Sequence, residues 1–371
     1  MRIIHLTDIH LSKENFDEFD DNLKIALIRD LKSYNVIEKP IDLIVITGDL
    51  VDKGGHSLKK LPQYKKHINP YDFFEEYFID PISKELNIPK SKFLFIPGNH
   101  DIDENEILWV DEKKMKMEID DKEVKNYLIK NENNFNSSNL RIKKFKDFES
   151  KFHSSTPNYK PTNNQSTYIY NYQSQFKIGF ILINDSWRCS TCLLENKDMN
   201  KHYFGAKQLY DGLRELDKSG TNLNICLLHH SLENFEEENE VVRFLTTKNI
   251  NLFLYGHYHK NKSSHYVNQI GSCYGFRGRA SLNNPDENHI SYVPGYNIFD
   301  IDILTNRIER IHFRLYNKEL STFAPDTLTA PRNGIDSNDK FGGKGYKFPQ
   351  NEESNNPFSA LDIKDFNQLS E

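Results

Sequence analysis

Cysteine is scarce in this sequence: the 371 residues include only four. So few cysteines in a chain of this length do not form a disulfide framework, which excludes the disulfide-stapled class. Cys189 and Cys192 have the spacing of half a zinc site, but the sequence lacks a second such pair, so we interpret them as reduced thiols in a loop. Cys226 lies inside an apolar run and is expected in the core.

Long hydrophobic runs and a large excess of one charge are also missing. No run approaches the roughly 20 apolar residues that a membrane span needs, and the first ten residues follow a strand pattern and not that of a signal peptide. The formal net charge is -6, so nothing indicates unspecific attraction to nucleic acid or to acidic membranes. We therefore expect a soluble, cytoplasmic protein with no membrane partner; the sequence says nothing about its oligomeric state.

The hydrophobic residues, only 37% of the chain, gather in six short runs rich in Ile, Leu, Val and Phe, which predict buried strands. These runs span residues 2–10, 42–52, 92–101, 176–187, 224–231 and 251–259. Apolar residues at helical spacing predict helices over 14–36 and 69–86. Alternating strands and helices predict an α/β fold, and 295–316 predicts an antiparallel hairpin.

Two stretches differ from this pattern. Residues 102–166 are dense in Lys, Glu, Asp and Asn, which predicts a charged, partly helical insertion within one domain of residues 1–316. Residues 317–371 are rich in Asn, Gly, Pro and Ser with few periodic signals, so we expect a C-terminal tail that is surface-packed or disordered.

Polar side chains follow five of the six predicted strands. They are Asp8 and His10, then Asp49 and Asp52, then Asn99, His100 and Asp101, then His229 and His230, and finally His257 and His259. Functional groups gather at strand ends in α/β folds, so we expect one shared site. Imidazole and carboxylate together suit manganese, iron, zinc or nickel. Seven candidate ligands are too many for one tetrahedral zinc and favour two ions that share a carboxylate. These seven are Asp8, His10, Asp49, Asn99, His229, His257 and His259.

The ordered motifs "DIH", "GDLVD", "GNHD", "HHS" and "GHYH" resemble those of the calcineurin-like metallophosphoesterase superfamily, over residues 1 to about 315. The resemblance implies a four-layer α-β-β-α sandwich with the site at its strand ends. It implies two divalent metal ions. Manganese is the expected metal, with iron, zinc or nickel as alternatives. The first ion would be held by Asp8, His10, Asp49 and His259, and the second by Asp49, Asn99, His229 and His257, with Asp49 bridging.

The resemblance also implies roles around the metals. His100 would meet the substrate phosphate and protonate or stabilise the leaving oxygen, with Asp101 holding its ring. A metal-bridging hydroxide would attack the phosphoester, and an imidazole near its ordinary pKa can deliver the proton at neutral pH. Asp52 and Asp101 are best placed as carboxylates that orient imidazoles or metal ligands from behind.

Four further residues have weaker support. His230 is expected beside the metal ligands or facing the substrate. Arg277 and Arg279 are candidates for gripping a phosphate or a base, with a solvated loop as the alternative. Arg188 either lines the cleft or merely follows Trp187, which would then cap the core.

The resemblance implies hydrolysis of a phosphoester but does not identify the substrate. A phosphodiesterase for a nucleotide or related phosphoester is expected first, because the loop around His229 and His230 resembles that of the cyclic-nucleotide branch. The alternative is a DNA or RNA nuclease like the DNA-repair members, although those usually carry His-Gly at this place and the composition shows no phosphate-tracking stripe. A protein phosphatase is disfavoured by "GDLVDKGG" and "PGNHD", and a non-catalytic scaffold by the intact ligand set. We hypothesise that residues 102–166 form a cap that restricts substrate size.

Overall fold

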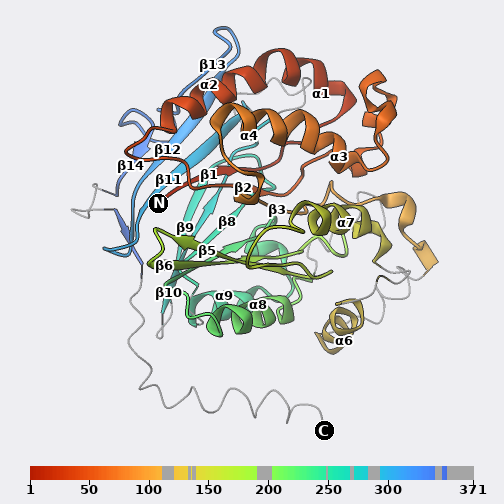
Figure 1. Ribbon diagram of the computed structural model, residues 1–371. Coiled ribbons are helices and arrows are strands. Elements are labelled where there is room, and N and C mark those ends of the chain that lie inside the picture. The colour runs from red at the N-terminus through yellow and green to blue at the C-terminus, as the bar shows by residue number, and fades with distance from the viewer. Residues whose placement is uncertain are drawn as a thin grey trace.

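The computed structural model describes residues 1–110, 121–132, 135, 139–189, 203–247, 250–267, 271–282, 293–338 and 345–348. Two β-sheets pack face to face, and helices cover the outer face of each (Figure 1). The expected four-layer α-β-β-α sandwich is therefore confirmed.

The first sheet has the strand order β13-β12-β11-β1-β2-β3, with β14 and β15 also paired to β12. Its strands are β1 (Arg2–Leu6), β2 (Leu43–Thr47), β3 (Phe93–Ile96), β11 (Gly295–Asp302), β12 (Arg307–Asn317), β13 (Thr322–Pro325), β14 (Ile335–Asp336) and β15 (Tyr346–Lys347). Strands β1, β2 and β3 are parallel. The predicted hairpin is confirmed as β11 and β12, with an irregularity between Asp300 and Ile301.

The second sheet has the strand order β4-β5-β6-β7-β8-β10-β9. Its strands are β4 (Tyr159–Lys160), β5 (Ser166–Tyr172), β6 (Phe176–Leu182), β7 (Leu223–Leu227), β8 (Leu252–Tyr255), β9 (Lys262–Val267) and β10 (Ser272–Arg277). Strands β6, β7 and β8 run parallel to one another. Their carboxyl ends therefore meet at one edge of the second sheet, as those of β1, β2 and β3 do in the first.

Helices on both outer faces complete the four layers. The first sheet is covered by α1 (Lys13–Glu18), α2 (Lys24–Tyr34), α3 (Pro70–Phe74), α4 (Asp80–Leu86) and α7 (Lys143–Phe152), and the second by α8 (Lys207–Asp217) and α9 (Glu238–Thr247). The helices predicted over 14–36 and 69–86 are confirmed, each with a π-helical turn in its middle. A further helix, α6 (Asp121–Asn131), packs against Trp187.

Alternate residues of each central strand face opposite apolar layers. In β1, Ile3 belongs to the core between the sheets, whereas Ile4 belongs to the core beneath α1 to α4. In β2, Val45 and Ile44 divide in the same way. Because both faces of these strands are buried, their sequences are continuous apolar runs without polar alternation, which is why the strands could be predicted.

The insertion differs from the expected cap. Helix α7 lies inside the predicted insertion, yet Phe145 and Phe148 are buried, and their rings lie 6.0 and 5.2 Å from that of Phe95 in β3. Lys146 and Glu149 are buried as an ion pair, and the other charged side chains of α7 are more exposed. The average composition of the segment therefore concealed an apolar stripe. At least α7 therefore belongs to the core, and the cap hypothesis does not hold for it. Residues 111–120, 133–134 and 136–138 of the insertion lie outside the described part.

The segment after residue 317 also contributes more than a tail. Strand β13 extends the first sheet beside β12, and its Phe323 packs against Tyr296 at 5.2 Å between ring centroids. Strands of two to four residues are too short for a periodic signal, so the sequence pattern missed them. Residues 339–344 and 349–371 lie outside the described part.

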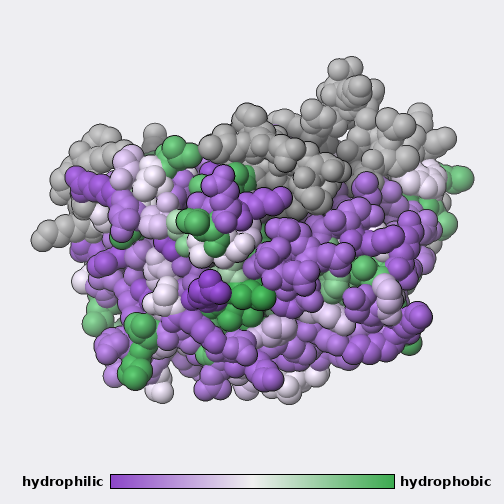
Figure 2. All heavy atoms as spheres, turned by 90° about the horizontal axis from the view of Figure 1, so that it is seen from above, coloured by the Kyte–Doolittle hydropathy of each residue, from purple (hydrophilic) through white to green (hydrophobic). Residues whose placement is uncertain are grey.

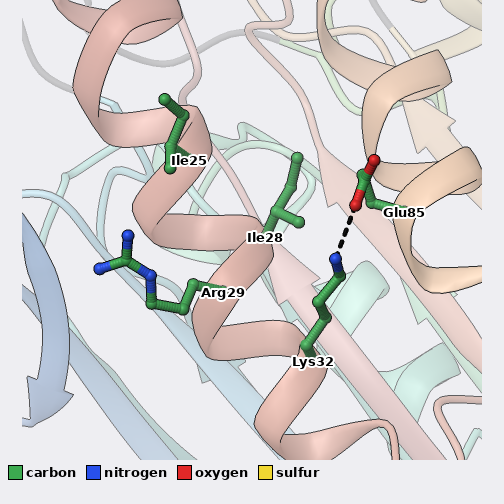
Figure 3. A pocket seen from close by; sticks show the side chains of 5 residues that line it. All are labelled: Ile25, Ile28, Arg29, Lys32 and Glu85. Atoms are coloured by element: carbon green, nitrogen blue, oxygen red, sulfur yellow. Dashed lines mark hydrogen bonds and ion pairs between the residues drawn. The ribbon is translucent and has the colours of Figure 1, made fainter.

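The outer surface over α1 to α4 is largely hydrophilic, with scattered hydrophobic side chains (Figure 2). Between α2 and α4 a shallow pocket is lined by Ile25, Ile28, Arg29, Lys32 and Glu85 (Figure 3). None of these is a candidate site residue. Across the part of the chain that the structure describes, we find no helix of the length and hydrophobicity needed to cross a membrane.

Candidate metal centre

The loops after β1, β2, β3, β7 and β8 bring the seven predicted ligands together. Asp49, in the loop after β2, lies in the middle of this group. One of its carboxylate oxygens, Oδ2, is 3.4 Å from His10 Nε2 and 3.2 Å from His229 Nε2. Asp49 therefore touches ligands from both sheets, as a bridging carboxylate must.

On one side of Asp49, three donors converge from the loops after β1 and β8. Asp8 Oδ1 is 3.9 Å from His10 Nε2 and 3.6 Å from His259 Nε2. The Nε2 atoms of the two imidazoles lie 3.4 Å apart. Donors bound to one ion at about 2.1 Å are separated by about 3–3.5 Å. The two imidazoles have this separation, and the carboxylate of Asp8 lies slightly farther from each of them.

On the other side, Asn99 Oδ1 is 3.0 Å from His229 Nε2 and 3.1 Å from His257 Nδ1. The second ring nitrogen of His229 lies 2.8 Å from the carbonyl oxygen of Thr47. A carbonyl only accepts hydrogen bonds, so Nδ1 carries a proton and Nε2 can offer a lone pair to a metal. The lone pair of His229 Nε2 then faces the oxygens of Asp49 and Asn99. These acceptors repel one another unless a cation binds between them.

The electrostatics of the protein atoms point the same way. Burial opposes a positive charge on His229, but the adjacent Asp49 carboxylate outweighs it and raises the pKa of His229 to about 10. Asp49 is buried too, yet His229 and His10 hold its pKa well below the usual value. A site that draws protons this strongly is suited to a divalent cation, which displaces them on binding. The residues therefore fit a pair of divalent ions.

Backbone strain is concentrated at these ligands. Five of the seven have positive φ: Asp8 at 52°, His10 at 48°, Asp49 at 54°, His257 at 75° and His259 at 55°. Residues other than glycine seldom adopt this region, and each such residue costs about 1–3 kcal/mol. The loops tolerate a strained backbone where it aims a ligand at the centre.

Two glycines make room for the carboxylates. A Cβ atom at Gly98 would lie 2.2 Å from Asp49 Oδ1, and one at Gly256 would lie 1.9 Å from Thr7 Oγ1 and 2.7 Å from Asp8 Oδ2. Neither position has space for a side chain, which explains the glycine that precedes the ligand in "GNHD" and "GHYH".

Comparison with known proteins agrees with this geometry. A model of the calcineurin-like phosphoesterase family matches residues 1–261. The chain belongs to this family. The superfamily is one of metal-dependent phosphoesterases with a centre of two divalent ions. This chain has groups of His and Asp side chains that could hold such ions.

The uncharacterized metallophosphoesterase-like protein YydB of Bacillus subtilis (strain 168) is 26% identical over 276 residues, which are 70% of this chain and 49% of that protein. The chain thus spans about half the length of this curated relative. Among solved structures, GAP50, the anchor in the inner membrane complex of Plasmodium, is 13% identical with a TM-score of 0.41, covering 85% of this chain and 84% of its own. Purple acid phosphatase PPD1 from yellow lupin is 12% identical with a TM-score of 0.42, covering 85% and 51%.

In this calcineurin-like phosphoesterase, His100 lies at the open side of the centre. Its ring is edge-on to His10 at 4.5 Å between centroids, its side chain is 26% exposed, and its Nδ1 is 2.6 Å from Asp52 Oδ1. Burial lowers the pKa of His100, but the carboxylates of Asp49 and Asp52 outweigh burial and raise it. His100 can therefore hold a proton near the metals.

The expectation that Asp101 holds the His100 ring is wrong, because Asp52 does so. Asp101 is buried and turns under the loops, where its carboxylate accepts backbone N–H groups. The donors are Gly98 at 2.9 Å, Leu50 at 3.1 Å and Val51 at 3.2 Å. Burial raises the pKa of Asp101 to about 7. Asp101 thus shapes the loops after β2 and β3, and Asp52 is the carboxylate that contacts the His100 ring.

Sequence reasoning missed Asp185, a fully buried carboxylate after β6. Its Oδ2 accepts the backbone N–H groups of His229 and His230, both at 2.9 Å. Burial raises the pKa of Asp185 to about 6. Its only signal was its position directly after the apolar run that ends in "ILINDSW".

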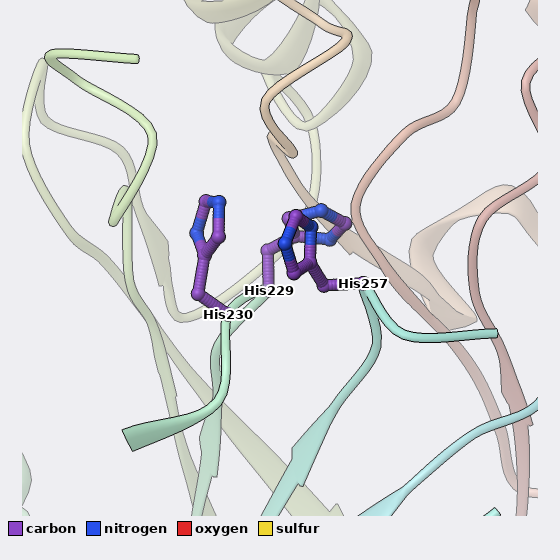
Figure 4. A group of neighbouring side chains, drawn as sticks. All are labelled: His229, His230 and His257. Carbon is purple, nitrogen blue, oxygen red and sulfur yellow. The ribbon is translucent and has the colours of Figure 1, made fainter. Parts of the chain in front are cut away.

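His230 lies beside the ligands, as expected. Its ring is buried and lies 4.8 Å from the ring of His229 and 4.6 Å from that of His257, at the ends of β7 and β8 (Figure 4). One of its nitrogens, Nδ1, is 3.4 Å from Asp185 Oδ1, and Nε2 is 3.8 Å from Cys189 Sγ. The ring nitrogens of His229, His230 and His257 lie within 4.8 Å of one another, so these three histidines also form a group that could hold a metal ion.

The three arginines have different places. Arg279 is buried and pairs with Asp326 at 3.4 Å, so it holds the C-terminal segment and is neither a phosphate clamp nor part of a solvated loop. Arg277 lies at the end of β10 near the metal loop. Arg188 is half-buried beside Trp187, whose ring is buried and lies 4.8 Å from that of Tyr127, which favours the core-capping interpretation of Trp187.

Proposed function

We propose that the chain is a phosphodiesterase that hydrolyses a nucleotide or a related phosphoester with two divalent ions, manganese first. The observation that carries this proposal is the position of Asp49, within 3.4 Å of His10 and 3.2 Å of His229 and next to the solvent-facing His100. Bound cations at this centre would neutralise phosphoester charge and make a water molecule more acidic. We also propose a cytoplasmic location, which the buried free thiols Cys226 and Cys273 support.

The side chains of this chain orient the ligands and supply the proton. The backbone N–H of His257 donates to both carboxylate oxygens of Asp8 at 3.1 Å, and the hydroxyl of Thr7 donates to Asp8 Oδ2 at 2.8 Å. Asp52 accepts the Nδ1 proton of His100, which leaves Nε2 as the nitrogen that serves the leaving oxygen. The roles of His100 as proton donor and of Asp52 as its positioning residue are part of the proposal.

Hydrolysis of bis-p-nitrophenyl phosphate tests the reaction. Protein stripped with a chelator and reloaded with manganese is expected to hydrolyse this diester. His100→Ala should lower kcat by about 10²–10⁴-fold, and Asp52→Asn by about tenfold. The matched control is His265→Ala, because His265 stacks on Tyr274 in the second sheet and has no proposed role. Silence of the wild type with manganese, nickel, zinc and iron would defeat the proposal.

A phosphoester panel separates the substrate classes. Cyclic nucleotides, dinucleotides, linear and circular DNA, RNA and monoesters are compared at equal metal loading, with His100→Ala as the background. Preferred cleavage of small nucleotide diesters supports the proposal. Preferred cleavage of DNA or RNA would identify the nuclease alternative.

A further inference from the structure

Tyr258 lies between two metal ligands, His257 and His259, and the metal centre does not use it. Its side chain is 41% exposed, although large aromatic side chains usually bury most of their surface. The neighbouring ligand side chain of His259 is 22% exposed, so this is an open side of the centre. An exposed aromatic ring is therefore present where a substrate would enter.

The ring of Tyr258 is held in place from several directions. The Asn234 side chain, from the loop after β7, donates to its hydroxyl at 2.8 Å. The ring of His257 lies edge-on at 4.9 Å between centroids, and the guanidinium of Arg277 lies 5.0 Å from the Tyr258 centroid. A ring fixed before a ligand arrives loses little conformational entropy on binding.

Arg277 is fixed as well. Its Nε donates to the carbonyl oxygen of Lys260 at 2.7 Å, which ties β10 to the metal loop. Within the described residues, its two terminal nitrogens have no acceptor. Arg277 thus places a flat, positively charged group over one face of the Tyr258 ring, which leaves the outer side of the guanidinium and the other face of the ring for a ligand.

We propose that Tyr258 and Arg277 form a platform that stacks the base of a nucleotide whose phosphate lies at the metal centre. This inference rests on the proposed function and narrows its substrate to nucleoside-containing phosphoesters. Bases stack on aromatic rings and on guanidinium planes, and such stacking tolerates any base because each has a flat π-face. An aliphatic substituent would gain nothing comparable from a fixed aromatic and guanidinium pair.

Two ligands that differ only in the base test the platform. Adenosine 5′-monophosphate and ribose 5-phosphate share the phosphate and the sugar, and calorimetry on manganese-loaded full-length protein gives both affinities without turnover. The wild type should bind the nucleotide about tenfold more tightly. In Tyr258→Leu and Arg277→Gln the nucleotide affinity should fall toward that of ribose 5-phosphate, whose own affinity stays unchanged.

Two further variants serve as controls. Tyr258→Phe keeps the ring and should retain most of the preference for the nucleotide. Tyr210→Leu removes a tyrosine of similar exposure on α8, which is 36% exposed, and should change neither affinity. Metal content is measured for every variant, so that a damaged centre is recognised.

Three results would overturn the platform: equal or undetectable binding of both ligands by the wild type, a preference that survives in Tyr258→Leu, or a parallel loss of both ligands in that variant. The last would show that Tyr258 only stiffens the metal loop. Hydrolysis of bis-p-nitrophenyl phosphate is measured separately. A protein that prefers the nucleotide but hydrolyses no phosphoester would keep the platform and lose the proposed function.

Discussion

Asp101 and Asp185 occupy equivalent places on the two sides of the metal centre. Each is buried directly after a strand, Asp101 after β3 in the first sheet and Asp185 after β6 in the second, and each accepts backbone N–H groups of the ligand loops. Asp101 accepts three such groups from two loops, whereas Asp185 accepts two from one loop. Each sheet therefore carries its own buried carboxylate that shapes its share of the site.

The ligands that the two sheets supply are different. The first sheet provides Asp8, Asp49 and Asn99 with one imidazole, His10, whereas the second provides imidazoles alone. In the proposed assignment each ion takes ligands from both sheets. The two sets meet at Asp49, so the packing of the sheets and the assembly of the centre depend on each other.

Removal of Asp49 should have the largest effect, because this residue joins the two sides. Asp49→Ala should lose both ions and about 10³-fold in activity, whereas Asp147→Ala, on the exposed face of α7, should lose neither. Elemental analysis of metal per chain and bis-p-nitrophenyl phosphate kinetics measure the two losses. A variant that keeps one ion at full affinity would show that the two sides bind metal independently.

Substitution of the glycines that precede the candidate ligands tests the two sides with a smaller expected effect. Gly98→Ala should weaken manganese binding by about 100-fold, because its Cβ would lie 2.4 Å from the backbone nitrogen of Asp49 and no side-chain rotation relieves that clash. Gly256→Ala meets the side chains of Thr7 and Asp8, which can shift, so about tenfold is expected.

Manganese titration of folded protein, checked by circular dichroism, gives these affinities. Gly220→Ala is the control, since nothing lies within 4 Å of its added Cβ and its positive φ of 63° affects stability alone. Equal losses in Gly98→Ala and Gly256→Ala would contradict the distinction between backbone and side-chain clashes.

Substitution of the two buried carboxylates tests the comparison directly. Asp101→Asn and Asp185→Asn keep the side-chain shape but place an amide NH₂ group near backbone N–H donors. Each variant therefore leaves a buried donor without an acceptor, which costs about 1–3 kcal/mol of folding free energy. We expect about 2–3 kcal/mol for Asp101→Asn and about 1–2 kcal/mol for Asp185→Asn, in proportion to their donors. Urea unfolding of metal-free protein at pH 8, where both wild-type groups are carboxylates, measures this. The reverse order would mean that donor count does not set their importance.

The same pair shows what the sequence can and cannot reveal. The identity of Asp101 was visible inside "GNHD", but not its partners, because adjacency to His100 does not show to which side a side chain turns after a tight loop. Asp185 stands in "NDS", which contains no histidine, and such a short polar stretch after a strand is an ordinary strand end. The meeting of the seven candidate ligands at one place could be predicted, because chemically matched histidines and carboxylates follow the buried parallel strands.

The predictions for α7 and β13 failed because each was judged from the average composition of a longer segment, in which a short apolar pattern is not visible. Phe145 and Phe148 of α7 are three residues apart and make an apolar stripe, yet the surrounding lysines and glutamates dominate the composition of the insertion. Short β13 offers too few residues for alternation to be recognised. Composition describes a segment as a whole, whereas burial depends on a few positions within it.

Asp300 is a buried carboxylate that can be compared with Asp101 and Asp185, because the cationic side chains of Arg2 and Lys39 neutralise its charge and no metal is needed. Its Oδ1 is 2.8 Å from Arg2 Nε and its Oδ2 is 3.1 Å from Lys39 Nζ. Burial alone would raise its pKa, but His312, Arg2 and Lys39 outweigh burial and hold the pKa of Asp300 well below its usual value. The ion pairs of Asp300 therefore stabilise the fold in full above the unfolded pKa of about 3.9, and this contribution is lost progressively as the pH falls from there through the lower pKa of the folded protein.

Wild-type protein should thus lose roughly 1–2 kcal/mol relative to Asp300→Asn between pH 7 and pH 3, since in this range the unfolded chain binds a proton at Asp300 and the folded protein does not. Urea unfolding at several pH values, with and without a chelator, measures this difference. The chelator should leave the Asp300 effect unchanged, because no metal ligand contacts that carboxylate within the described residues, whereas it should change the effects of Asp101→Asn and Asp185→Asn. An Asp300 effect that is as large at pH 3 as at pH 7, or that depends on the chelator, would show that a buried carboxylate neutralised by arginine behaves no differently from those beside the metal centre.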